Sequence, residues 1–378
     1  MKLPAELKDL KVALVCDWLL GVGGAEKVVL AVHELFPAAP IYTSQYDPKL
    51  VDWFDNMDVR TGWLNRLSPK LKKFLPILRA QYFSHLDLTA YDLVISLNIS
   101  EAKGVKTRPT ALHVSYMQGP PTQYYWGLYD DFIKDPGFGK FDWLARIGLK
   151  TFVTRQRKID YKFAQNPNYI IANSTYVAKE VKKYYDRDSI VICPPVEVDK
   201  FHNSSKSKRD GFLIAGRQSP WKKVDLAIKT CIQTGDKLTV LGNGSEHNKL
   251  VKLAREHNNI KIAPAYNGAP ELLKYLVAAR ALIFPSLEPF GIVPVEALSA
   301  GTPVIAYGKG GALDYVQDSK NGILFNSQTV SSLKSAIKKF NKTKFNRQLV
   351  AKSADKFSNA NFKRQIVDYL AECIKSHA

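Results

Sequence analysis

A buried strand followed by a glycine-containing turn and a helix occurs in both halves of this chain. In the first half, the apolar segment 11–17 precedes Gly21-Val-Gly-Gly24 and a helical pattern that begins at Ala25. In the second half, the apolar segment 211–215 precedes a loop and a helical pattern within 216–233. Such units build parallel sheets with helices on both faces, so we predict two doubly wound α/β domains.

Further strand-like segments support this organisation. They occupy 39–43, 93–97, 111–116 and 169–172 in the first half, and 237–241, 259–262, 281–284 and 303–306 in the second. A chain of 378 residues also favours two domains over one core. The polar, serine-rich stretch 195–210 is the predicted hinge between them.

Two carboxylates eight residues apart follow the strand 281–284. Glu288 is predicted on the loop after this strand, and Glu296 in or near the first turn of a helix that begins near Ile292. A helix N-terminus favours an anion, so backbone amides between the two carboxylates could bind a diphosphate. One carboxylate could then bind sugar hydroxyls and the other ribose hydroxyls, which suits a nucleotide sugar. The spacing fits an alternative equally well, in which the glutamate at the start of the helix binds no ligand and only complements the helix dipole.

The residues around this pair resemble the acid-x7-acid motif of retaining family 4 glycosyltransferases. The similarity runs with gaps from about Lys11 to Phe357 and includes Gly216–Asp225, Gly301–Tyr307, Gly310–Leu313 and Asn321–Phe325. It is greatest to the bacterial mannosyltransferase-like branch that builds O-antigen and other surface polysaccharides. The resemblance implies a GT-B fold, in which two Rossmann-like domains face each other across a cleft. The implied parts are an acceptor-side domain at 1–195, a donor domain at 196–357, and a helix at 358–378 that crosses back to the first domain.

The resemblance also implies a donor site. Arg217 and Lys222 would hold the departing phosphate as a planar fork and a point charge, and Glu288 would hold sugar hydroxyls. These three are the predicted catalytic residues. The predicted donor-binding residues are Gly23, Gly24, Gly216, Arg217, Lys222, Gly242, Gly244, Glu288, Phe290, Gly291, Ile292 and Glu296. No metal and no other cofactor is expected, because the basic loop can replace an ion at the diphosphate.

The segment 111–126 resembles the family's acceptor-side segment. Many relatives have a Tyr-x-His-x-Pro pattern, whereas this chain has Tyr116-Met-Gln118-Gly-Pro120. Tyr116 and Gln118 are the predicted acceptor-side residues. Glutamine can donate a hydrogen bond to a sugar hydroxyl but cannot titrate. His113 is expected to be a structural histidine.

The charge balance points to an anionic partner. The 54 Lys and Arg residues exceed the 35 Asp and Glu residues and give a formal net charge of +19. No nucleic-acid-binding signature accompanies this charge, so an anionic membrane is preferred to nucleic acid. Two basic, partly apolar stretches could lie on such a membrane, 66–83 (with Lys70, Lys72, Lys73 and Arg79) and 146–162; packing on their own domain is an equal alternative.

The expected protein is a glycosyltransferase that uses a nucleotide sugar, with GDP-mannose favoured. Its acceptor would be a glycan or a polyprenyl-phosphate-linked sugar. No signal peptide or bilayer-length apolar run is evident, and the four cysteines form no CxxC pair, so we expect a cytoplasmic protein, peripheral on the inner face of the membrane. Two alternatives stay open, a nucleotide-sugar epimerase of the same fold and a non-catalytic glycan- or polyanion-binding module.

Overall fold

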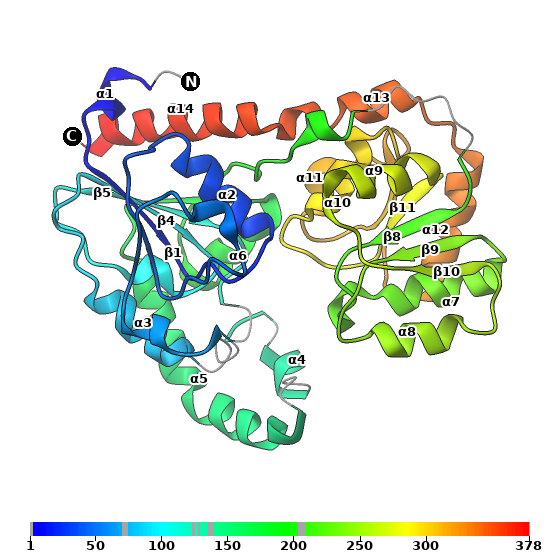
Figure 1. Cartoon of the computed structure of the whole chain (residues 1–378), viewed down its shortest axis with the longest axis horizontal. Coiled ribbons are helices and arrows are strands. Elements are labelled where there is room, and N and C mark those ends of the chain that lie inside the picture. Colours follow the sequence, from blue (N-terminus) through cyan, green and yellow to red (C-terminus); the bar gives the residue numbers. More distant parts are fainter. Residues whose placement is uncertain are drawn as a thin grey trace. The chain divides into compact units, whose positions relative to one another are not determined.

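The chain forms two compact units, each built from a parallel sheet and helices (Figure 1). The computed structural model describes residues 3–69, 75–122, 125–127, 129–134, 139–202 and 209–377. Unit 1 comprises residues 1–195 and 362–378, and unit 2 comprises residues 196–361. Unit 2 ends at Asn361, whose side chain donates a hydrogen bond to the carbonyl of Asp355 at 3.0 Å.

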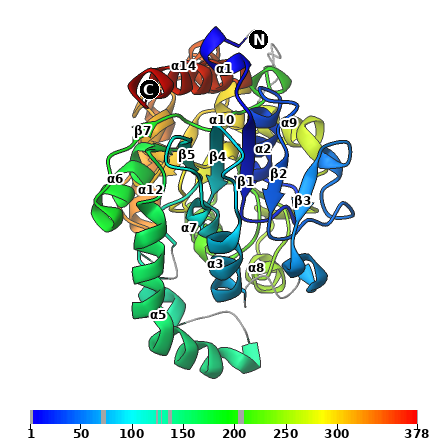
Figure 2. The same cartoon turned by 90° about the vertical axis from the view of Figure 1, so that its left-hand side faces the viewer.

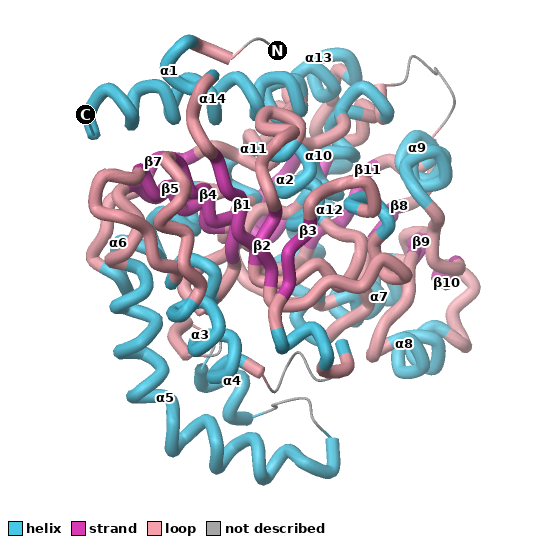
Figure 3. Tube along the Cα trace, turned by 60° about the vertical axis from the view of Figure 1, so that its left-hand side comes forward, coloured by secondary structure: helices cyan, strands magenta, loops and turns pink. Residues whose placement is uncertain are grey.

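Unit 1 contains a seven-stranded sheet in the order β3-β2-β1-β4-β5-β6-β7, and every neighbouring pair is parallel. Figure 3 shows β1, β2, β4 and β5 running side by side. Its strands are β1 (Val12–Cys16), β2 (Ile41–Thr43), β3 (Val59–Thr61), β4 (Leu93–Asn98), β5 (Leu112–Met117), β6 (Tyr169–Ala172) and β7 (Ile190–Val191). Every residue of β1, β4 and β5 is buried, which is typical of parallel strands covered on both faces.

Helices cover both faces of this sheet. The helices of unit 1 are α1 (Ala5–Lys8), α2 (Gly24–His33), α3 (Pro76–His85), α4 (Tyr129–Lys134), α5 (Asp142–Ala164), α6 (Thr175–Tyr185) and α14 (Asn359–His377). Short 3-10 helices lie at Asp52–Phe54, Trp63–Arg66, Glu101–Gly104 and Gly139–Phe141. Leu14 of β1 packs in a cluster with residues of α2 and α14, whereas Val15 packs with Phe83 of α3. Adjacent residues of a strand point to opposite faces, so α2 and α14 cover one face and α3 the other.

Unit 2 contains a six-stranded parallel sheet in the order β10-β9-β8-β11-β12-β13. Its strands are β8 (Phe212–Ala215), β9 (Leu238–Leu241), β10 (Ile260–Ala263), β11 (Ala281–Phe284), β12 (Val304–Tyr307) and β13 (Gly322–Phe325). Its helices are α7 (Val224–Thr234), α8 (His247–Ala254), α9 (Gly268–Ala278), α10 (Ile292–Ser299), α11 (Ala312–Tyr315), α12 (Val330–Lys342) and α13 (Arg347–Lys352), with 3-10 helices at Val198–Lys200, Pro220–Lys222 and Asp355–Phe357. Residues of α7 and α12 share one core cluster with the strands, and α10 contacts β11 and β12.

The predicted hinge at 195–210 begins at the boundary between the units, and its first apolar residues are buried. Val196, Val198 and Phe201 are buried, and the amide of Val196 donates to the carbonyl of Phe357 at 2.8 Å. Ser299 Oγ donates to the carbonyl of Val198 at 2.7 Å. The apolar residues of this stretch therefore pack into unit 2; residues 203–208 lie outside the described part of the chain.

None of the helices in the described ranges is both long enough and apolar enough to span a bilayer.

Candidate functional site

A cavity in unit 2 lies where the strand order of its sheet reverses. From β8 the chain proceeds to β9 and β10 on one side, and then crosses to β11, β12 and β13 on the other. Parallel sheets commonly bind ligands outside the carboxyl ends of the strands at such a reversal. The cavity lies between the residues that follow β8 and those that follow β11. Its polar side chains are Arg217, Gln218, Lys222, Ser286 and Glu288.

Lys222 and Glu288 form an ion pair in this cavity. Lys222 Nζ lies 2.5 Å from Glu288 Oε1, which also accepts a hydrogen bond from Ser286 Oγ at 2.9 Å. Both side chains are mostly shielded from solvent, with 26% and 18% of their surfaces exposed. The sequence predicted both residues at this site, but not their pairing and not Ser286. An anion that entered the cavity would compete with Glu288 for Lys222.

Arg217 is the second cation of the cavity, and its side chain is exposed. Within the described ranges, its guanidinium has no hydrogen-bond or ion-pair partner. A guanidinium is a planar fork of donors that matches phosphate geometry. Arg217 is therefore available to an anion without the loss of an existing contact.

Close backbone contact between two turns supports the loop that carries Arg217. A Cβ atom at Gly242 would lie 2.1 Å from the carbonyl oxygen of Gly216, and one at Gly244 would lie 2.3 Å from that of Gln218. The Gln218 side chain joins the same turns, because Nε2 donates to the carbonyl of Gly242 at 2.8 Å. Gly216 lines the cavity, whereas Gly242 and Gly244 pack against the backbone of the loop that carries Arg217.

The loop that carries Glu288 is fastened by backbone contacts. The amide of Gly311 donates to the carbonyl of Glu288 at 2.9 Å, and Tyr315 Oη donates to that of Phe290 at 3.0 Å. The ring of Phe290 is buried edge-on against Tyr315, so only its backbone could reach a ligand. Gly291 has φ +93°, and a Cβ atom there would lie 2.8 Å from the ring of Phe284.

The helix after this loop begins at Ile292, as predicted, and Glu296 lies directly after its first turn, as its fifth residue. Glu296 is 6% exposed and is not among the residues that line the cavity. Burial, and after it the charge of Glu296, raises the pKa of Tyr266 to about 12. The two predicted carboxylates therefore occupy different surroundings, with Glu288 in the cavity and Glu296 close to Tyr266.

A second cavity lies at the corresponding reversal in unit 1, between β1 and β4. Its polar or aromatic side chains include Asp17, Trp18, Glu26 and Gln118. Asp17 accepts hydrogen bonds from the amides of Ile99, Ser100 and Ala102, which fix its carboxylate. No Lys or Arg side chain lines this cavity in the described part of the chain. It therefore suits hydroxyl groups better than phosphate.

The side chain of Glu26 lies against the glycine turn that precedes α2. A Cβ atom at Gly23 would lie 3.0 Å from Glu26 Oε2, so this carboxylate already lies at the N-terminus of the helix. A diphosphate there would meet the charge of Glu26. This geometry argues against the predicted donor-binding role of Gly23 and Gly24.

Of the two predicted acceptor-side residues, only Gln118 lines the unit 1 cavity. The prediction for Tyr116 is wrong: its side chain is fully buried, donates to the carbonyl of Ile192 at 2.9 Å, and packs edge-on against Phe362. Tyr116 shares a face of β5 with Leu112 and Val114, and α2 and α14 cover this face, so the ring lies in the core. His113 is a buried structural residue, as expected, and its Nε2 is 3.0 Å from Ser96 Oγ.

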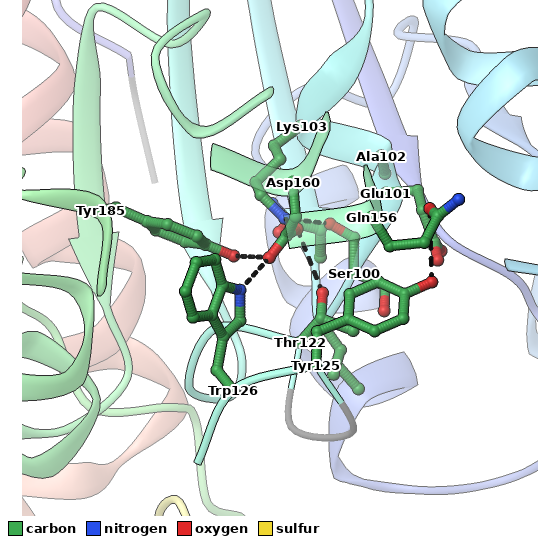
Figure 4. A network of polar contacts seen from close by, with 12 residues as sticks. Ser100, Glu101, Ala102, Lys103, Thr122, Tyr125, Trp126, Gln156, Asp160 and Tyr185 are labelled. Atoms are coloured by element: carbon green, nitrogen blue, oxygen red, sulfur yellow. Dashed lines mark hydrogen bonds and ion pairs between the residues drawn. The ribbon is translucent and has the colours of Figure 1, made fainter. Parts of the chain in front are cut away.

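A buried polar network ties the segment after Gln118 to α5 (Figure 4). Asp160 of α5 accepts hydrogen bonds from Thr122 Oγ1 at 3.1 Å, and from Trp126 Nε1 and Tyr185 Oη at 2.7 Å each. Lys103 Nζ lies 2.8 Å from the same carboxylate, and both side chains are almost fully buried. Sequence alone did not identify this network, because its members are spread from residue 103 to residue 185.

No cluster of three His, Cys, Asp or Glu side chains that could hold a metal ion occurs within the described ranges. The chain contains one Asp-x-Asp triplet, Asp186-Arg-Asp188, of the kind that holds metal in other nucleotide-sugar enzymes. Both of its carboxylates are exposed and pair with Lys182, at 3.1 and 3.3 Å. The triplet lies in unit 1, outside both cavities.

The residues of unit 2 match a known family. Residues 195–364 match the family model described as Glycosyl transferases group 1. The fold of the chain is GT-B. The Anabaena protein Alr3699/HepE in complex with UDP superimposes with a TM-score of 0.66 and 17% identity, over 96% of this chain and 100% of that chain. The lipopolysaccharide outer core galactosyltransferase WaaB superimposes with a TM-score of 0.68 and 15% identity, over 97% of this chain and 99% of that chain.

Similarity to curated proteins covers shorter segments. A D-inositol 3-phosphate glycosyltransferase of Pseudarthrobacter chlorophenolicus is 30% identical over 197 residues, which are 45% of this chain and 47% of that protein. A glycogen synthase of Mycobacterium tuberculosis is 34% identical over 108 residues, 28% of this chain and 26% of that protein. The chain thus spans about half or less of the length of these relatives.

Proposed function

We propose that the protein is a retaining glycosyltransferase that moves a sugar from a nucleoside diphosphate to a glycan or polyprenyl-phosphate-linked acceptor in the synthesis of a surface polysaccharide. The cavity at the strand reversal of unit 2, where Arg217 and Lys222 lie beside Glu288, carries this proposal. The match of the same unit to group 1 glycosyl transferases supports it.

Arg217 and Lys222 would assist departure of the nucleoside diphosphate. Negative charge grows on the phosphate as the bond to the sugar breaks, and preorganised positive charge at that point is usually the largest catalytic contribution. Arg217 has no partner to give up among the described residues, and Lys222 would exchange Glu288 for a phosphate oxygen. Two fixed cations could then replace a metal ion, so transfer should survive chelation by EDTA. Activity that disappears with EDTA and returns with magnesium or manganese would contradict this.

Glu288, released from Lys222, would accept hydrogen bonds from hydroxyls of the donor sugar. Ser286 Oγ holds one of its oxygens at 2.9 Å and would keep the carboxylate in place. The charge of Glu288 would then orient the sugar while the two cations hold the diphosphate. In unit 1, the cavity with Trp18, Glu26 and Gln118 suits the neutral sugar end of an acceptor.

GDP-mannose is the donor we propose, on the resemblance of the motifs to mannosyltransferase-like enzymes. A panel of nucleotide sugars tests this by thermal shift and by release of nucleoside diphosphate, with and without glycan acceptors. We expect the largest shift with GDP-mannose, and diphosphate release only when an acceptor is present. Conversion of a donor to an isomer without acceptor would indicate the epimerase, and glycan binding without any turnover would indicate the binding module.

A further inference from the structure

The first half of α5 carries apolar side chains that its own unit does not cover. Residues 142–152 include no buried side chain, whereas the second half of the helix buries Val153, Gln156, Asp160 and Phe163. Figure 2 shows this first half extending away from the sheet. Trp143, Leu144 and Ile147 are 60%, 54% and 55% exposed. A cluster of large apolar side chains this exposed is typical of an interaction surface.

The outer side of α5 changes from apolar to basic along its length. Positions 144, 147, 151, 155, 158 and 162 are three or four residues apart, so they lie along one side of the helix, and all six are exposed. This side begins with Leu144 and Ile147 and ends with Arg155, Lys158 and Lys162. The only acidic residues of α5 are Asp142 and Asp160, and Asp160 is buried. The outer side of α5 is therefore apolar at its N-terminal end and positively charged at its C-terminal end.

The other basic stretch, 66–83, has no comparable face in its described part. Arg79 of α3 is buried and pairs with Glu101 at 2.9 Å, and Phe83 is also buried. The basic and apolar side chains Arg79 and Phe83 of α3 therefore pack on its own domain. Lys70, Lys72 and Lys73 lie outside the described residues.

We propose that the outer side of α5 rests on an anionic lipid bilayer. Leu144 and Ile147 of this side, with the neighbouring exposed Trp143, would lie in the interfacial layer, and Arg155, Lys158 and Lys162 at the headgroup phosphates. Tryptophan and aliphatic side chains favour this layer, and basic residues add attraction to anionic lipid. The network around Asp160 fixes the second half of α5 to unit 1, so the projecting half is held by a rigid support (Figure 4). This proposal does not depend on the transfer reaction.

Flotation of the full-length protein with vesicles tests the proposal. We expect binding to vesicles with about one third phosphatidylglycerol, little binding to phosphatidylcholine alone, and weaker binding as salt shortens the roughly 8 Å screening length. Changing Trp143→Ser with Ile147→Ser, or Lys158→Glu with Lys162→Glu, should lower the affinity for anionic vesicles about tenfold or more. Nucleoside diphosphate binding, read by calorimetry, should not change.

Matched controls come from unit 2. Leu349→Ser removes an apolar side chain that is 64% exposed, and Lys338→Glu with Lys342→Glu reverses two charges on α12; neither should alter vesicle binding. Equal affinity for neutral vesicles, or α5 variants that bind as the unchanged protein does, would overturn the proposal. A dimer that dissociates on Trp143→Ser with Ile147→Ser, measured by sedimentation, would assign the surface to a second copy and overturn it too.

Discussion

At the scale of single residues, the pairing of Lys222 with Glu288 decides how the cavity of unit 2 would accept an anion. The ion pair holds both groups in position without ligand, yet a diphosphate must displace Glu288 to reach Lys222. Binding and transfer should therefore respond in opposite directions to a change at Glu288.

We predict that Glu288→Gln binds nucleoside diphosphate several-fold more tightly while transfer falls by ~10²–10³. Lys222→Met should weaken both, because it removes the cation itself. Calorimetric titration and a transfer assay on the same preparations measure the two effects. Asp210→Asn, which breaks the exposed pair with Lys237, is the control and should change neither. Weaker diphosphate binding in Glu288→Gln would show that the two groups do not compete.

His113 should make the folded protein sensitive to acid. Burial, and then the charge of Arg187, lowers its pKa to about 3. In the unfolded chain the pKa of His113 is about 6.5, so the unfolded state takes up a proton more readily than the folded state. The free energy of unfolding therefore falls as the pH drops from about 6.5 towards 3. The loss approaches that of one proton taken up on unfolding, roughly 1 kcal/mol per pH unit in that window. Urea unfolding at several pH values should show a shallower acid dependence for His113→Gln; identical slopes would show that His113 is not protonated on unfolding.

At the scale of elements, the Lys103–Asp160 pair connects α5 to the segment that follows Gln118. The side chains of Lys103 and Asp160 are only 1% and 5% exposed, so removal of one charge leaves the other without its ion-pair partner in the interior. Asp160→Asn should lower the free energy of unfolding by roughly 3–5 kcal/mol. Denaturant unfolding measures this loss, and Asp188→Asn at the exposed pair with Lys182 should cost less than about 1 kcal/mol. A similar small effect at both sites would mean that the network does not hold α5.

At the scale of the whole molecule, the chain leaves unit 1 and returns to it only in α14. The helix contributes Phe362, Ile366, Val367 and Leu370 to the unit 1 core. Burying four such side chains contributes roughly 6–12 kcal/mol, comparable to the total stability of a domain. Deletion of 362–378 should therefore unfold unit 1, whereas unit 2 keeps its own core and its nucleoside diphosphate binding.

Scanning calorimetry and diphosphate titration of this deletion variant check the prediction. We expect the transition of unit 1 to be lost and that of unit 2 to remain. Removal of 376–378 alone keeps the four apolar residues and serves as the control. A deletion of 362–378 that leaves both transitions intact would show that α14 is dispensable for unit 1.

Sequence alone determined the architecture because parallel strands carry a local signal. Segments 12–16 and 281–284 are continuous apolar runs, followed by Asp17 and by Pro285. A strand buried on both faces can be recognised from such a run without knowledge of its partners. The same local signals placed Glu288 after a strand and the start of a helix at Ile292. The edge strand 59–61, the two-residue strand 190–191 and the strand 322–325 were not predicted; the first two are short and largely exposed, so they lack the apolar run.

Only the tertiary structure decided which of the predicted residues face a ligand. Whether Tyr116 points to a cavity or to the core depends on the helix that packs against its strand, here α14, whose residues are far away in sequence. Packing likewise buried Arg79 against Glu101 but left Trp143 exposed on an equally amphipathic helix. The pairing of Lys222 with Glu288 joins loops after different strands, and no local pattern encodes it. Burial and ion pairing depend on neighbours brought together by the fold, whereas strand and helix formation depends largely on adjacent residues.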